Sequence, residues 1–285
     1  MQLQRYNMAE VVEKAEHLPY VTTVVLRLME IISNPDVSVQ EVVGEIKKDQ
    51  GLVARVFKVA NSTFYGRLKR AENLNDAVVT VGLRGLYSLV LADVVKQVLM
   101  TADQGDQSLW RHAVKVSVAS VVLAKEMRCN ALDDALVGGL VHDIGKAFIE
   151  SVYPGISSFI NQKVAKDRVT YEDAEMSILG FDHAAIGASV TEKWNFPPKM
   201  VDVIRHHHGP NDMKDVRVAS QELLRMIKLA NVISSQCDQL PNVCKDNEVH
   251  EALGSLGTLD LTPERLTSLM EEIKVKWEDE NKLYY

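Results

Sequence analysis

Apolar residues recur at helical spacing along almost the whole chain, and no stretch alternates apolar and polar residues over the length of a strand. Residues spaced i, i+3 and i+4 share one face of a helix. The clearest such stripe near the N-terminus consists of Val21, Val24, Val25, Leu28 and Ile32. This helix is expected to end before Asn34-Pro35, because a proline ring blocks continuation. The sequence therefore predicts an all-α fold, a bundle of two helical lobes.

Helix-start signals divide the first half of the chain. The tetrapeptide Ser38-Val39-Gln40-Glu41 is a capping box, in which the serine oxygen and the glutamate carboxylate satisfy free amides of a new helix. Asp49 is predicted to cap the next helix. A longer apolar helix is expected after Gly82.

The second half reads as a series of shorter helices, with a polar segment before it. Residues 101–108 are polar and contain Gly105, which places a lobe boundary near residue 105. Three units are predicted: an N-terminal helical lobe at 1–105, a second helical lobe at 106–240, and a loop with a C-terminal helix at 241–285, starting at Thr262-Pro263. The helices expected in the second lobe span 108–127, 132–142, 146–152, 155–167, 171–179, 182–194, 198–208 and 218–236.

Composition limits the partners and the cellular compartment that we expect for the protein. The formal net charge of -7 disfavours duplex nucleic acid as a partner. The three cysteines form no C-x-x-C pair, which is typical of a protein in a reducing compartment and argues against a zinc-thiolate site. The stretch 83–100 contains Arg84, Asp93 and Lys96 and is short for a membrane span, and residues 1–16 lack the apolar core of a signal peptide. We expect a cytoplasmic protein with no membrane partner.

Histidine and aspartate mark the candidate chemistry. The pentapeptide His142-Asp143-Ile144-Gly145-Lys146 lies between an isolated His112 and a later group formed by His183 and the run His206-His207-His208. Imidazole and carboxylate hold divalent first-row metals. Adjacent residues within a helix diverge by about 100°, so His142 and Asp143 can share a metal only at a helix end, which Gly145 is expected to supply.

Each of these side chains also has a structural reading. A single histidine is usually packed or exposed rather than a ligand, and His183 can simply hydrogen-bond within the helix that Asp182 caps. Consecutive side chains diverge, so at most two residues of the run 206–208 share a site, and His208 is the one expected outside it. Lys146 is placed to meet a phosphate as a point charge if the site is hydrolytic.

Several spaced motifs resemble one family. The sequence is similar to the HDOD family, the HD-related output domains of bacterial signalling proteins, over about residues 17–235. In the first half the matching motifs include Leu18-Pro19, Asn34-Pro35-Asp36, Ala60-Asn61-Ser62 and Val81-Gly82-Leu83. In the second half they are Trp110-Arg111-His112, residues 139–146, residues 179–187, Trp194-Asn195-Phe196-Pro197 and His206-His207.

The resemblance implies a metal site. Enzymes of the HD superfamily place a first His, a His-Asp doublet and a distal Asp around a metal, and the related HD-GYP phosphodiesterases add another His and a His-His pair. The positions of this chain that match are His112, His142, Asp143, His183, His206 and His207. The implied cofactor is a divalent transition metal, namely Fe, Mn, Zn or Ni, with a protein that binds none as the alternative.

Two positions depart from the enzymatic pattern. Asn231 stands where the distal Asp is expected, and Ser108 stands where an acidic residue precedes the first His by one helical turn. An amide in place of a carboxylate removes negative charge and an oxygen donor for a hard divalent ion. The Gly-Tyr-Pro signature of the HD-GYP enzymes is also absent after His208-Gly209-Pro210.

These observations favour a regulatory reading over a catalytic one. The leading hypothesis is a bacterial signal-transduction module that binds a signalling protein and keeps a degenerate HD site, with or without a metal. The alternative is an active metal-dependent phosphohydrolase or phosphodiesterase, in which Lys146 steadies the phosphate. A third hypothesis is a sensor that binds a nucleotide or phosphate ligand in the same site without turnover.

Overall fold

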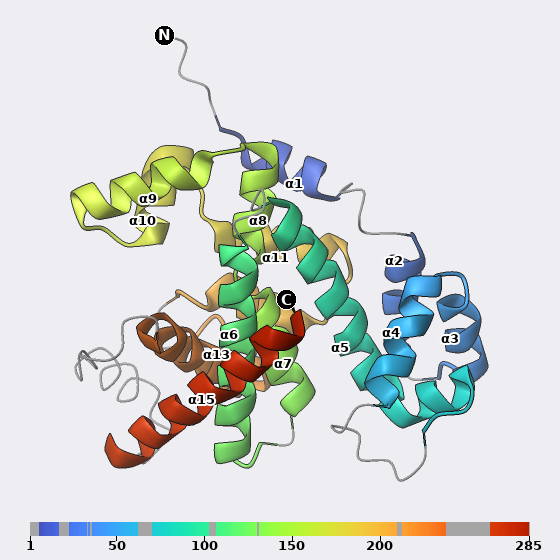
Figure 1. Cartoon of the computed structure of the whole chain (residues 1–285). Coiled ribbons are helices and arrows are strands. Elements are labelled where there is room, and N and C mark those ends of the chain that lie inside the picture. Colours follow the sequence, from blue (N-terminus) through green and yellow to red (C-terminus); the bar gives the residue numbers. More distant parts are fainter. Residues whose placement is uncertain are drawn as a thin grey trace.

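The computed structural model describes residues 6–16, 23–32, 34, 36–61, 70–102, 107–129, 131–209, 213–237 and 263–284. Every regular element within these ranges is an α-helix, which confirms the predicted all-α fold (Figure 1). The predicted boundary at residue 105 and the predicted loop after residue 241 lie outside the described residues.

The described residues of the first half form five helices, and two of them, α3 and α4, start at the predicted caps. The Ser38 hydroxyl accepts a hydrogen bond from the backbone N of Glu41 at 3.2 Å, and an Asp49 carboxylate oxygen accepts one from the backbone N of Leu52 at 2.9 Å. The helices are α1 (Met8–Glu16), α2 (Thr23–Ile32), α3 (Val39–Ile46), α4 (Gln50–Ala60) and α5 (Leu74–Ala102).

The Asp49 cap gives a first testable prediction. Asp49→Ala is expected to lower the free energy of unfolding by about 1 kcal/mol, because α4 loses a side-chain acceptor at its free amides. Urea unfolding followed by circular dichroism measures the change. The exposed Gln40→Ala on α3 is the control and is expected to change stability little. An equal loss in both variants would contradict the capping role.

Helix α5 is the central element that joins the two halves. Gly82, with φ of 71° and ψ of 165°, kinks it, and its two sides pack against α2, α3 and α4 and against α7 and α8. Among the described helices α5 is the one long and apolar enough to cross a membrane by length and composition, and 50% of its most apolar window is buried. A buried core helix meets the same criterion, and the many helices that contact α5 favour that interpretation.

The second half contains the helices that the apolar pattern predicts, each shifted by at most a few residues. Helix α6 packs against α7 and α13, and α11 packs against α8 and α12. The helices are α6 (Ser108–Glu126), α7 (Leu132–Val141), α8 (Ile144–Val152), α9 (Ile156–Asp167), α10 (Tyr171–Leu179), α11 (His183–Lys193), α12 (Pro198–His206), α13 (Val218–Cys237) and α15 (Pro263–Tyr284).

Both ends of the described chain pack on the second half. Helix α15 lies along α6, where the Lys115 ammonium sits 4.6 Å from the centre of the Trp277 ring. Helix α1 packs against α8 and α11, and the Tyr153 hydroxyl of the α8 end donates to the Glu10 carboxylate at 3.0 Å. The sequence-based division assigned α1 to the first lobe, whereas these contacts join it to the second.

Two glycines allow helices to touch backbone to backbone. A Cβ atom on Gly145 would lie 1.9 Å from the carbonyl oxygen of His183, and one on Gly139 would lie 2.4 Å from the Cα atom of Ser117. The prediction that Gly145 ends a helix is wrong, because α7 already ends at Val141 and Gly145 lies in the first turn of α8. Its role is to let α8 cross α11 closely, and this crossing brings His183 beside the His-Asp pair.

Candidate metal centre

The His142-Asp143 pair occupies the short junction between α7 and α8. His142 follows the last residue of α7 with helical φ and ψ of −52° and −39°, and Asp143 precedes α8 with φ of −100° and ψ of 10°. Both side chains are buried, with 0% and 4% of their surface exposed. The change of helix at this junction lets two adjacent residues face one point, as the sequence predicted for a helix end.

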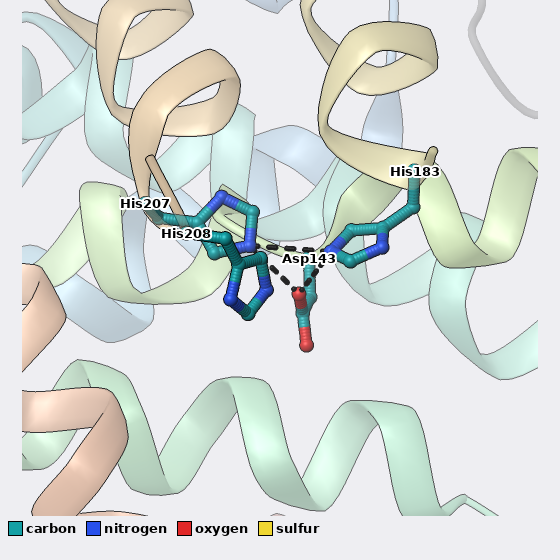
Figure 2. Close-up of side chains that lie close together, drawn as sticks. All are labelled: Asp143, His183, His207 and His208. Carbon is teal, nitrogen blue, oxygen red and sulfur yellow. Dashed lines mark hydrogen bonds and ion pairs between the residues drawn. The ribbon is translucent and has the colours of Figure 1, made fainter. Parts of the chain in front are cut away.

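Four imidazoles surround the Asp143 carboxylate. Its Oδ1 atom lies 3.2 Å from His183 Nε2 and 3.1 Å from His207 Nε2. Its Oδ2 atom lies 3.5 Å from His142 Nε2 and 3.6 Å from His112 Nε2. Figure 2 shows Asp143 between His183, from the start of α11, and His207 and His208, from the end of α12.

Three of these histidines are oriented by hydrogen bonds on their outer side. His142 Nδ1 lies 2.8 Å from the carbonyl oxygen of Gly139, and His207 Nδ1 lies 2.8 Å from that of Ile204. His183 Nδ1 lies 2.6 Å from a Glu175 carboxylate oxygen. Carbonyl and carboxylate oxygens accept hydrogen bonds, so each Nδ1 carries a hydrogen and Nε2 points inward. Metal-binding histidines are held in this way.

The donor atoms fall into two groups that share Asp143. One contains His183, His207 and His208, and the other contains His112 and His142; within each group the donor atoms lie within 4.8 Å of one another. His142 Nε2 is buried and has no hydrogen-bond partner among the described residues. A buried lone pair without a donor costs free energy that a cation would recover. Imidazoles with one carboxylate fit a divalent transition metal.

The histidine run differs from the prediction in one residue. The sequence assigned the ligand pair to His206 and His207, whereas the structure brings His207 and His208 into the donor group and leaves His206 outside both groups. The reason is that α12 ends at His206, so the chain turns at His207 and His208. His208 Nε2 then reaches a Glu172 carboxylate oxygen at 2.8 Å.

Lys146 lies against the carboxylate at the centre of the site. Its Nζ atom is 2.6 Å from Asp143 Oδ2 and 4.7 Å from the centre of the Tyr171 ring. The ammonium therefore pairs with Oδ2, the oxygen that faces His112 and His142. Its predicted contact with a phosphate stays a prediction.

The two positions that depart from the enzymatic pattern also lie near the site. The side chain of Asn231, on α13, lies beside His112. Ser108 is the first residue of α6, one turn before His112. Asn231 thus lies beside the first His, where the resemblance places the distal acid, and it brings an amide instead of a carboxylate.

Helix α10 supplies two carboxylates that sequence reasoning missed. Glu175 is 1% exposed, and one oxygen accepts from both the backbone N of His183 at 2.9 Å and its Nδ1. Glu172, one turn earlier, pairs with His208. The i, i+3 spacing of two acids on a short helix is the signal that the sequence carried, but this spacing is common on solvent-facing helices.

Burial and charge set the protonation of the site without a metal. Burial lowers the pKa of His142 well below 6.5 and that of His207 to about 3, so both rings are neutral. Burial and the Lys146 ammonium also oppose a charge on His183, but its bonds to Asp143 and Glu175 outweigh them and raise its pKa to about 9. Burial alone would raise the pKa of Asp143, yet Lys146 and the histidines hold it well below 3.8. A divalent ion would therefore displace a proton from His183.

Fold and site together define an all-α protein with a buried, histidine-rich centre built around one aspartate. The HDOD domain family matches residues 18–210. The chain belongs to the HDOD family, as the sequence motifs predicted.

Known proteins of the same kind come from several bacteria. An uncharacterized protein of Treponema pallidum (strain Nichols) is 30% identical over 202 residues, which are 70% of this chain and 39% of that protein, so the chain spans less than half the length of this relative. A crystal structure of a putative phosphohydrolase from Shewanella amazonensis SB2B has a TM-score of 0.68 with 26% identity, covering 94% of this chain and 95% of the other. A second protein of that organism, described as a putative metal-dependent phosphohydrolase, has a TM-score of 0.61 with 24% identity, covering 95% and 97%.

Proposed function

We propose that the protein is a cytoplasmic signal-transduction module that holds a divalent transition metal at Asp143 and acts by binding a signalling protein. One observation carries the metal assignment: three buried imidazoles donate outward through Nδ1 and direct Nε2 at a single carboxylate. The regulatory role is supported by the resemblance to the HDOD family, the output domains of bacterial signalling proteins.

The donor set favours some metals over others. Imidazoles outnumber carboxylates in both donor groups, which suits Fe, Zn or Ni better than Mg or Ca. Mn prefers oxygen donors and ranks below them here. A bound ion would connect the α7–α8 junction, the start of α11 and the residues that follow α12, and would stabilise the native state more the more tightly it binds.

Charge favours a regulatory over a hydrolytic role. Two-metal hydrolysis places two divalent ions close together, and this requires several carboxylates at the ions. In this site Asp143 is the carboxylate that both donor groups share, and Lys146 already pairs with one of its oxygens. Asn231 and Ser108 add no charge. We therefore propose a regulatory protein with a degenerate HD site in preference to a hydrolytic enzyme.

A metal-dependent phosphohydrolase is the second candidate. It is favoured by Lys146 at the edge of the centre and by the likeness to a protein described as a putative phosphohydrolase. The metal would supply a Lewis acid, and Lys146 would leave Asp143 to contact a phosphate oxygen. The same contact without turnover would serve a sensor for a nucleotide or phosphate ligand.

Metal content and turnover test these assignments together. Protein purified without chelators is expected to contain transition metal by inductively coupled plasma mass spectrometry and to leave bis-p-nitrophenyl phosphate and cyclic dinucleotides intact with added Mn²⁺, Fe²⁺ or Mg²⁺. His207→Gln is expected to lose the metal, whereas the matched control His206→Gln, outside both donor groups, keeps it. Metal-dependent turnover that disappears in Asp143→Ala would replace the regulatory proposal by the enzymatic one. A wild-type protein free of metal would refute the metal centre.

A further inference from the structure

The two donor groups around Asp143 have different surroundings. We name them the α11–α12 half, which comprises Asp143 Oδ1, His183, His207 and His208, and the α6–α7 half, which comprises Asp143 Oδ2, His112 and His142. The groups that contact the histidines from outside differ in charge. This difference decides which half binds a cation more tightly.

Carboxylates of α10 stand behind the α11–α12 half. Glu175 lies 2.6 Å from His183 Nδ1, and Glu172 lies 2.8 Å from His208 Nε2. With Asp143 this half is surrounded by three carboxylates. A carboxylate behind an imidazole fixes its ring orientation and raises its basicity as a ligand, and removing such a partner typically costs about 10–100-fold in metal affinity.

Helix α10 is itself held in place near the site. The Tyr171 side chain lies beside Ser157 at the start of α9, and the Ser157 hydroxyl donates to the Glu150 carboxylate at 2.6 Å. Glu150 also accepts from the backbone N of Ser157 at 3.0 Å. The chain of contacts leads from α8 through the α9 start to α10, so Glu172 and Glu175 are fixed relative to the helix that follows Asp143.

The α6–α7 half has weaker support. Behind its histidines stand the carbonyl oxygen of Gly139 and the amide of Asn231, which are both neutral. The carboxylate oxygen that faces this half, Asp143 Oδ2, is paired with the Lys146 ammonium at 2.6 Å. A cation that binds in this half must displace Lys146 from Asp143 Oδ2 or lie close to its ammonium group. Because the ion and the ammonium are both positive, they repel each other at this short distance. His142 Nε2 has no hydrogen-bond partner among the described residues and offers a lone pair to a cation there. The carboxylate oxygen beside it, Asp143 Oδ2, is already paired with Lys146.

We propose that the first metal ion is held by the α11–α12 half, with Glu175 and Glu172 as positioning residues, and that the α6–α7 half binds a second ion only weakly. The inference rests on the metal centre proposed above. It places the tighter site away from the His-Asp doublet's own histidine and assigns a role to α10, a helix that carries no ligand.

Titration of the metal-free protein with Co²⁺, followed by its visible absorption, tests the proposal. The first equivalent is expected to bind about 10–100-fold more weakly to Glu175→Gln, which keeps an oxygen acceptor but removes the charge. His207→Gln is expected to abolish this binding, and His112→Gln to leave it nearly unchanged. Glu192→Gln, at an exposed glutamate of α11, the helix that begins with His183, is the control and is expected to bind as the wild type does.

A proton resonance separates positioning from a purely structural effect. In the Zn²⁺-loaded wild type, the His183 Nδ1–H that donates to a carboxylate is expected to resonate far downfield, and Glu175→Gln is expected to shift it upfield while Glu192→Gln does not. An unshifted resonance, an unchanged Co²⁺ affinity in Glu175→Gln, or a loss in His112→Gln equal to that in His207→Gln would overturn this inference and leave the metal centre standing. A wild type that binds no Co²⁺ would overturn both.

Discussion

Replacing Gly145 by alanine is expected to lower the free energy of unfolding by roughly 3 kcal/mol or more. The added Cβ atom would lie 1.9 Å from the carbonyl oxygen of His183, 2.7 Å from its carbonyl carbon and 2.9 Å from the backbone N of Gly187. All three are backbone atoms, so no side chain can rotate to make room, and α8 must move away from α11. Urea unfolding of the metal-free protein measures the loss.

Gly44→Ala is the matched control for this substitution. Gly44 lies inside α3, and a Cβ atom there would meet no heavy atom within 4 Å. Alanine favours a helix over glycine by about 1 kcal/mol, so this variant is expected to be more stable than the wild type. The two glycine substitutions should therefore have opposite signs. A Gly145→Ala protein as stable as the wild type would show that α8 and α11 do not cross at this distance.

Gly145→Ala should also impair the metal centre. His183 begins α11 at the crossing, so separation of the two helices moves its imidazole away from Asp143. The packing of Gly145 and the position of His183, the proposed ligand, thus depend on the same contact between α8 and α11.

Features whose partners lie nearby in sequence could be predicted. Ser38 and Asp49 bind amides three residues later, and each helix carries its own apolar stripe, so the helices and these caps follow from the sequence. The His-Asp doublet could also be assigned, because its family spacing to His112 and His183 is distinctive. The structure places all four side chains around one point.

The histidine run shows how a small shift in a helix end changes a site. Helix α12 was expected to reach residue 208 and ends at His206. Each residue turns a side chain by about 100°, so an error of two residues at the helix end is enough to exchange inward and outward histidines. The family resemblance assigned the pair to His206 and His207, and the helix end decides that His208 faces the site instead.

Contacts between distant segments could not be predicted. The sequence favoured a helix end at Gly145, because glycine serves both helix ends and close helix crossings. Only the fold shows that the residue faces the backbone of His183. Glu175 and the docking of α1 on α8 and α11 depend in the same way on packing that no local pattern encodes.

Acid is expected to destabilise the metal-free protein through buried histidines that are neutral in the folded state. In the unfolded chain a histidine titrates near 6.5, whereas burial in the folded protein lowers the pKa of His207 to about 3 and that of His142 well below 6.5. Between pH 6.5 and about pH 3 the unfolded state therefore binds more protons than the folded state, so the free energy of unfolding falls as the pH falls. His207 contributes up to about 1.4 kcal/mol per pH unit, and His142 adds to the slope in the same direction.

His183 acts in another range of pH and does not cancel this slope. Its pKa is raised to about 9, so it contributes stability that is complete below pH 6.5 and is lost as the pH rises through 9. Urea unfolding at several values between about pH 6.5 and 4.5 should therefore report the histidines of the donor groups whose pKa burial lowers, namely His112, His142 and His207. His207→Gln removes one of them and should reduce the slope by about 1.4 kcal/mol per pH unit, while Gln40→Ala keeps the wild-type slope. A slope unaffected by His207→Gln would mean that the ring is already protonated in the native state, so that its Nε2 has no free lone pair to offer to a metal ion beside Asp143.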